Sequence, residues 1–136
     1  MVDTFETATN WNNIDEQMQQ MQEAVRTSLT EESEEVMAFT HISHVYKQGA
    51  SLYTTYFFRA AKDHATTLQR WQKIKHAASV SLAHGKATIS HQHGVGRDHA
   101  PYLAAEKGRL GMQVTHDMLK SLDPEQRMNP GVLLEK

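Results

Sequence analysis

Residues 36–59 read VMAFTHISHVYKQGASLYTTYFFR, and this stretch decides the fold. β-Branched and aromatic residues dominate 36–46 and again 50–59, which predicts two strands. The tripeptide Lys47-Gln48-Gly49 between them has the composition of a turn. We therefore expect a β-hairpin. Because a lone hairpin is marginal in water, it requires a wider sheet and helices packed against it.

Helical periodicity lies on both sides of this hairpin. Apolar residues recur every three or four positions from Trp11 to Leu29, which predicts an amphipathic helix. After the hairpin, Asp63 is a suitable helix cap, and apolar positions recur at helical spacing until Gly85, a residue typical of a helix end.

A last helix is predicted over 101–122. Gly108 is a point at which it could break, and Asp123-Pro124 ends it.

The remaining segments complete the predicted architecture. Residues 1–9 are interpreted as an extended lead-in, 30–35 as an acidic connector, and 87–90 as a third, short strand. Strands and helices in this order favour an α+β fold, with an antiparallel or mixed sheet carrying helices on one face. Three strands make a thin sheet, so we expect a further strand to come from residues outside this sequence or from a second chain.

Composition excludes several classes of function. The 136 residues carry a formal net charge of -2 and no cysteine. A clustered basic surface for nucleic acid is therefore not indicated. Disulfides, thiolate metal sites and a cysteine nucleophile are excluded. No apolar run reaches the length of a membrane span, and the first residues lack the pattern of a secretory signal. These features fit a cytoplasmic protein.

Histidine is the unusual residue, because eight of the nine lie between His41 and His99. The most prominent group is HQHGVG at residues 91–96. In extended backbone, the imidazoles of His91 and His93 point to the same side, and the glycines permit tight turns. Arg97, next along the chain, can hold a phosphate or a carboxylate with its guanidinium. The alternative is a glycine turn with exposed histidines.

The predicted hairpin carries further polar candidates. His41 and His44 lie an odd number of residues apart, so they face opposite sides of a regular strand. At most one of them can then share a site with the 91–96 loop, unless a bulge intervenes. Tyr46, Tyr53 and Tyr56 offer phenols that either pack in the core or transfer protons in the same cavity, and the sequence does not distinguish among them.

These histidines could instead form a metal site. His41 or His44 with His91 and His93 could hold zinc, or iron if Asp98 joined them. No dense ligand motif such as His-Glu-x-x-His is present, however, and the spacing matches no compact metal loop. We therefore predict no bound metal.

Several blocks together resemble the C-terminal domain of FAD-linked oxidases, flavoenzymes of the vanillyl-alcohol-oxidase type. The blocks are DTFETA at 3–8 with Trp11, HISHVY at 41–46, GASLY at 49–53, TISHQHGVGR at 88–97, PYL at 101–103, DP at 123–124 and MNPG at 128–131. They occur in the family's order over nearly the whole chain. Within the family the likeness is greatest to the alkyldihydroxyacetonephosphate synthase branch, which has a histidine-rich stretch before Gly-Val-Gly.

The resemblance implies that residues 1–136 form a ferredoxin-like cap domain with an incomplete antiparallel sheet and helices on one face, and that the FAD-binding domain is absent from this sequence. It implies that the flavin does the redox chemistry while this part shapes the substrate pocket. The site residues it implies are His91, His93 and Tyr53 for catalysis, Arg97, His44 and Tyr46 for substrate binding, and Asn129, Gly94 and Gly96 near the flavin.

Gln92 is a departure from the family pattern. The glycolate- and lactate-oxidising branches have a glutamate at this place that supports a metal, so Gln92 further favours the absence of metal.

The implied partners are FAD, held mainly by the missing domain or by a partner chain, and a small hydroxy acid or acyl-glycerone phosphate. Two alternatives stay open from the sequence: a free-standing histidine-rich module that binds a metal or another ligand, and a non-catalytic subunit that forms a homodimer through its sheet edge.

Overall fold

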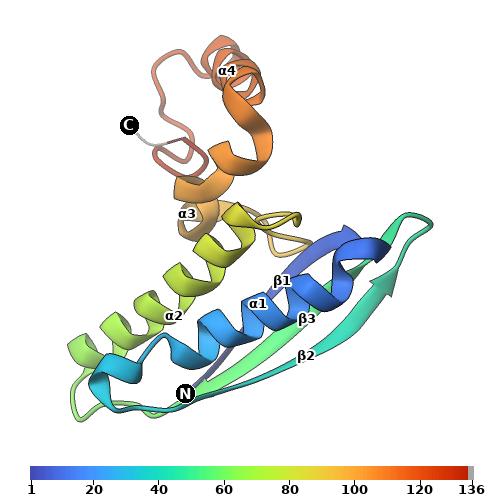
Figure 1. The fold of residues 1–136 in the computed structure, drawn as a ribbon. Helices are drawn as coiled ribbons and strands as arrows, with labels where there is room; N and C mark the ends of the chain where they lie inside the picture. Colours follow the sequence, from blue (N-terminus) through green and yellow to red (C-terminus); the bar gives the residue numbers. More distant parts are fainter. Residues whose placement is uncertain (135–136) are drawn as a thin grey trace.

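The hairpin predicted over residues 36–59 is present in the computed structural model, which describes residues 1–134 (Figure 1). Its strands are β2 (Val36–Val45) and β3 (Gly49–Phe58). A third strand, β1 (Val2–Asn10), pairs with the other side of β3. All pairings are antiparallel, and the strand order is β1-β3-β2.

The prediction that residues 1–9 form an extended lead-in is wrong, because they form β1. Phe5, Thr7 and Thr9 are buried on one side of this strand. The residues between them, including Glu6, point to the other side, as the period of a strand requires. Glu6 stands opposite Tyr53 of β3 in the register, so the first strand contributes directly to the face of the sheet that carries Tyr53.

Two long helices cover one face of the sheet (Figure 1). They are α1 (Ile14–Thr27), entered through the 3-10 turn η1 (Trp11–Asn13), and α2 (His64–His84). Both confirm the helical periodicity of the sequence. Asp63 caps α2 by accepting a hydrogen bond from the backbone N–H of Thr66 at 2.8 Å. The core between helices and sheet is made of Phe5, Ile14, Met21, Val25, Leu29, Val36, Ala38, Ala50, Leu52, Tyr56, Phe58, Ile74, Ala78, Leu82 and Ile89.

The opposite face of the sheet, called here the open face, carries no helix (Figure 1). Its side chains follow from the strand period and the register: Val2, Thr4, Glu6 and Ala8 on β1, Ser51, Tyr53, Thr55 and Phe57 on β3, and Met37, Phe39 and His41 on β2. Met37 and Phe39 are 57% and 61% exposed. A sheet with one solvated face normally presents polar residues there, so these apolar side chains mark a surface suited to a partner.

Residues 87–90 do not form the predicted strand. They run antiparallel beside β1, where a fourth strand of a ferredoxin-like sheet would lie, but only the bridge between Thr9 and Ala87 is regular. Hydrogen bonds from side chains replace part of the backbone pairing. The backbone N–H of Ala8 donates to the Thr88 hydroxyl, and the Thr9 hydroxyl donates to the Lys86 carbonyl. The sheet of the described residues is thus a three-stranded, incomplete ferredoxin-like sheet, as expected.

The C-terminal part begins with the short helix α3 (Gly96–His99) and the turn η3 (Ala100–Tyr102). It continues as α4 (Leu103–Leu122), which extends away from the sheet (Figure 1). The expected break is confirmed at Gly108, whose φ of 64° is outside the helical region. Among the described residues, the helices are too short or too polar to cross a membrane.

Candidate functional site

A bulge in β2 places both strand histidines on the open face. The register passes from the pair Ile42 and Leu52 to the pair Val45 and Ala50, so Ser43 and His44 together stand opposite Ser51. Such a bulge inserts one residue and reverses the alternation beyond it. His41 and His44 therefore share one face, which a regular strand would not allow.

The loop between α2 and α3 brings two more histidines to this face. The backbone N–H of Thr88 donates to the carbonyl of Ala8, and that of His91 donates to the carbonyl of Glu6, each at 2.9 Å. Beyond His91 the chain turns back through positive φ values at Gln92 (58°) and Gly94 (73°). His91 thus lies beside β1, and the turn at Gln92 places His93 next to Glu6 and Tyr53.

Six side chains form what we call the histidine–tyrosine cluster: His41, His44, Tyr46, Tyr53, His91 and His93. The Tyr46 hydroxyl lies 2.8 Å from Nε2 of His91. The ring of Tyr53 lies 5.4 Å from that of His41 and 5.5 Å from that of His93. The sequence therefore predicted five members of one physical group, His44, Tyr46, Tyr53, His91 and His93, and left His41 open.

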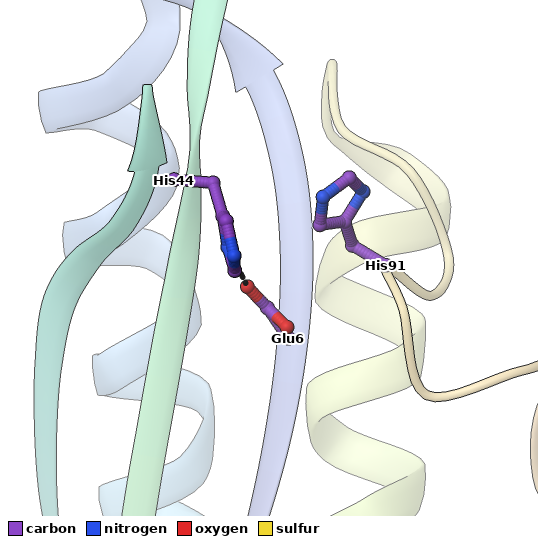
Figure 2. Close-up of side chains that lie close together, drawn as sticks. All are labelled: Glu6, His44 and His91. Carbon is purple, nitrogen blue, oxygen red and sulfur yellow. Dashed lines mark hydrogen bonds and ion pairs between the residues drawn. The ribbon is translucent and has the colours of Figure 1, made fainter. Parts of the chain in front are cut away.

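Glu6 lies beneath this cluster, with its side chain only 2% exposed. Its Oε1 is 3.4 Å from Nδ1 of His44, and its Oε2 is 3.6 Å from Nε2 of His93. Figure 2 shows the imidazole of His44 directed at the carboxylate, with His91 approaching from the loop. Among the described residues the ion-pair partners of Glu6 are imidazoles, with no lysine or arginine beside them.

The ionisation of Glu6 depends on these neighbours. Burial alone would raise the pKa of Glu6, but hydrogen bonds from Ser51, His44 and Ser43, together with the charge of His91, lower it overall. Glu6 is therefore an anion at neutral pH, held by neighbouring hydroxyl and imidazole groups.

Other predicted site residues lie outside the cluster. Arg97 is exposed on α3, and Asn129 is exposed in the turn after α4, where its carbonyl accepts from Val132 N–H. Neither has a contact with the cluster in the described part of the chain. Gly94 and Gly96 have positive φ values and open space where a Cβ would stand, so their backbone is accessible to a ligand.

Glu6 is the residue that the sequence reasoning missed as a site residue. It lies in a segment that the sequence predicts as an extended lead-in, and this prediction gives Glu6 no place on a face of the sheet. The sequence signal was weak, because Phe5 is the one large apolar residue among residues 3–9, so the two faces of the strand do not show as an alternation of apolar and polar residues.

A metal could be held by Glu6, His44 and His91, whose ligand atoms all lie within 4.8 Å of one another. Glutamate with two histidines is a donor set known for zinc. The metal site described from the sequence also included His93 and Asp98, and neither of them is among these three residues. In the structure one nitrogen of each imidazole already has a partner: Nδ1 of His44 lies against Glu6, and Nε2 of His91 lies against Tyr46.

The arrangement can transfer protons. Imidazoles and phenols can each donate and accept, and the cluster presents them on an accessible face above a buried carboxylate. Such a surface can take a proton from a hydroxyl group or donate hydrogen bonds to a phosphate or a carboxylate.

Comparison with known proteins shows the family to which this chain belongs. The family described as "FAD linked oxidases, C-terminal domain" matches residues 1–133. The alkyldihydroxyacetonephosphate synthase of Trypanosoma brucei brucei is 27% identical over 132 residues, 97% of this chain and 21% of the relative. That of Dictyostelium discoideum is 23% identical over 133 residues, 98% of this chain and 21% of the relative.

Solved structures agree on the fold. A structure of alkyldihydroxyacetonephosphate synthase superimposes with a TM-score of 0.57 at 17% identity, covering 95% of this chain and 20% of that one. The chain thus spans about a fifth of the length of the relatives that it matches. With the match over residues 1–133, the chain belongs to the family of FAD-linked oxidase C-terminal domains.

Proposed function

We propose that residues 1–136 are the substrate-cap part of an FAD-dependent oxidoreductase or an alkyldihydroxyacetonephosphate synthase-like enzyme. In this proposal the open face of the sheet forms one wall of the substrate pocket and lies over the flavin. The observation that carries the proposal is the position of the histidine–tyrosine cluster on the one sheet face that no helix covers.

The open face fits the reacting end of a flavin site. Phe39 and Phe57 meet edge to face there, with ring centres 6.2 Å apart, and suit contact with a flat ring system. The acceptors and donors of the cluster lie on the same face. No arginine or lysine of the described residues is paired with the cluster. The phosphates of FAD are therefore assigned to another domain, or to a partner chain, as in our expectation.

When bound, FAD supplies the capacity to accept a hydride or to form an adduct with the substrate. The residues of this chain handle protons and orient the substrate. Tyr53, between His41 and His93, is placed to donate a hydrogen bond to a substrate oxygen. In the structure the Tyr53 hydroxyl donates to Thr4 Oγ1 at 3.2 Å, a contact that a substrate oxygen can replace. His91 and His93 take a proton from the substrate or bind its anionic group.

Two substrate classes suit these groups: a 2-hydroxy acid, whose hydroxyl proton is removed as hydride leaves, and an acyl-glycerone phosphate. Both present an oxygen that loses or gains a proton, next to an anionic group. Partners through the free edge of β2, including a second copy of the chain, stay a prediction.

The first test is the size of the natural protein in cell extract, detected with an antibody raised against this chain. The proposal expects a product several times heavier than 15.4 kDa that carries FAD after purification. A product at the size of the chain itself, with no flavin-binding partner chain, would contradict it.

The second test uses that purified protein. Tyr53→Phe removes the hydroxyl but keeps the ring, and we expect turnover of the accepted substrate to fall about 100-fold or more, with FAD content unchanged. The matched control is Tyr102→Phe, because Tyr102 bonds His76 on α2, outside the cluster. Equal losses of turnover in both variants would show that the cluster does not take part in the reaction.

A further inference from the structure

The contact between Glu6 and His44 restricts which nitrogen of the imidazole carries its proton. Nδ1 of His44 lies 3.4 Å from Oε1 of Glu6. An ionised carboxylate only accepts hydrogen bonds. The nitrogen that faces it must therefore be the N–H of the ring, which leaves Nε2 of a neutral His44 with its lone pair.

We propose that Glu6 is a positioning residue that turns the Nδ1–H of His44 into the protein, so that Nε2 of His44 accepts a proton from the substrate at the open face. The substrate step rests on the proposed function, whereas the orientation of His44 does not. The proposal changes the role of His44 from a substrate-binding group to the proton acceptor, which leaves His91 and His93 to bind the anionic group of the substrate, and it adds Glu6 to the site.

The surroundings of the two residues agree with this arrangement. The Glu6 side chain is 2% exposed and that of His44 is 45% exposed, so the carboxylate lies inside and the imidazole reaches the surface. Figure 2 shows His44 extending from β2 across to the carboxylate on β1. A buried acceptor that holds one ring nitrogen sets the tautomer and the direction of the other.

Two serines also approach the same nitrogen. Oγ of Ser43 lies 2.9 Å from Nδ1 of His44, and Oγ of Ser51 lies 3.3 Å from it. A hydroxyl can donate or accept, so neither serine alone decides whether Nδ1 carries a proton. Glu6 can only accept, so its contact determines that Nδ1 of His44 carries the proton, and the two serine contacts follow from this. The serines then orient their hydroxyl hydrogens to suit.

Glu6 also restrains the loop that carries the other two histidines. Its backbone carbonyl accepts the N–H of His91 at 2.9 Å. Its second carboxylate oxygen lies 3.6 Å from Nε2 of His93, which is ion-pair rather than hydrogen-bond range. One residue thus fixes the position of the strand histidine and of the loop relative to it.

The test is nuclear magnetic resonance of the metal-free 136-residue chain, with the imidazole nitrogens labelled, at about pH 8, where ordinary histidines are neutral. In the wild-type chain, His44 is expected as the Nδ1–H tautomer. Glu6→Met removes the acceptor at similar size and should abolish that signature. Glu6→Gln retains an amide oxygen for His44 and should restore it. Ser43→Ala, the matched control on the same nitrogen, should leave it in place.

The wild-type measurement alone can overturn the proposal, because an Nε2–H tautomer at His44 is incompatible with it even if Glu6→Met does not fold. Retention of the Nδ1–H signature in folded Glu6→Met, or its loss in Ser43→Ala, would assign the role to the serine instead. The readout needs no flavin and no substrate. A failed tautomer prediction therefore leaves the proposed function to its own tests, and a protein without FAD leaves the Glu6–His44 assignment intact.

Discussion

The Tyr46 hydroxyl lies 2.8 Å from Nε2 of His91 and joins the hairpin turn to the loop that follows α2. Tyr46 is itself held, because its backbone N–H donates to the carbonyl of Gly49 at 2.8 Å. The contact links positions that are 45 residues apart in sequence. It is therefore one of the tertiary bonds that set how far the loop reaches over the open face.

Replacing Tyr46 by phenylalanine should loosen the loop without unfolding the chain. The bond is exposed, so its loss should lower the free energy of unfolding by no more than about 1 kcal/mol. Amide exchange at His91 should become about five-fold faster, since local opening follows the same free-energy difference. Urea denaturation and hydrogen exchange measure the two effects.

The control for this change is Tyr102→Phe, which removes a hydroxyl bonded to Nδ1 of His76 at 2.6 Å. It removes a second exposed tyrosine–histidine bond, but outside the cluster. Unchanged exchange at His91 in Tyr46→Phe, or an equal increase in the Tyr102 variant, would show that Tyr46 does not restrain the loop.

A second prediction concerns Asp3, which ties α2 to β1. Its Oδ2 accepts from Trp71 Nε1 at 2.7 Å and from the Tyr56 hydroxyl at 3.0 Å, while Oδ1 accepts from the Thr4 N–H. Asparagine must turn its NH₂ group toward one set of these donors. We expect Asp3→Asn to cost about 1 to 3 kcal/mol in urea unfolding at neutral pH. The exposed Asp15→Asn should cost less than about 1 kcal/mol.

The same network gives a pH dependence. Burial alone would raise the pKa of Asp3, but hydrogen bonds from Trp71, Thr4 and Tyr56 and the charge of Lys75 lower it overall. A carboxyl group whose pKa is lower in the folded state stabilises the fold above its unfolded value, about 3.9. That stability is lost as the pH falls through the folded value. The gap between wild type and Asp3→Asn should therefore narrow below about pH 4; a constant gap would contradict the assignment.

The hairpin and the two main helices could be predicted from the sequence because each has its own period. The β-branched and aromatic runs around Gly49 and the apolar spacing of Ile14, Met21 and Val25 are local signals. β1 has no such run, since threonine and alanine alternate with a single Phe5. Its identity as a strand depends on pairing with β3, which is a long-range contact.

The site was predictable only in part, for the same reason. Tyr53, His91 and His93 were recognised from their motif, whereas the shared face of His41 and His44 depends on a bulge opposite Ser51. The sequence of the strand contains no residue that predicts a bulge at this position. Residues 87–90 failed as a strand because the hydroxyls of Thr7, Thr9 and Thr88 take hydrogen bonds that backbone groups would otherwise make.

A third prediction concerns metal. Nδ1 of His44 is engaged by Glu6 and Nε2 of His91 by Tyr46, so zinc bound at these two nitrogens would break both contacts. We expect the purified chain to contain no stoichiometric metal and its urea unfolding to be unchanged by a chelator. One zinc per chain, lost together with stability in Glu6→Gln, would establish a metal site instead.

The last prediction separates the open face from the core. Phe39 is 61% exposed and touches Phe57 at its edge, whereas Phe5 is 3% exposed beneath α1 and α2. Phe39→Lys should therefore lower the free energy of unfolding of the chain by about 1 kcal/mol or less, against about 3 to 5 kcal/mol for Phe5→Ala.

In the natural flavoprotein, Phe39→Lys should nevertheless lower the FAD content, because a charge would be buried against the flavin-binding part. Phe39→Leu should retain FAD. Destabilisation of the isolated chain by Phe39→Lys as large as that of Phe5→Ala would mean that this side of the sheet is part of the domain's own core rather than a surface for a partner.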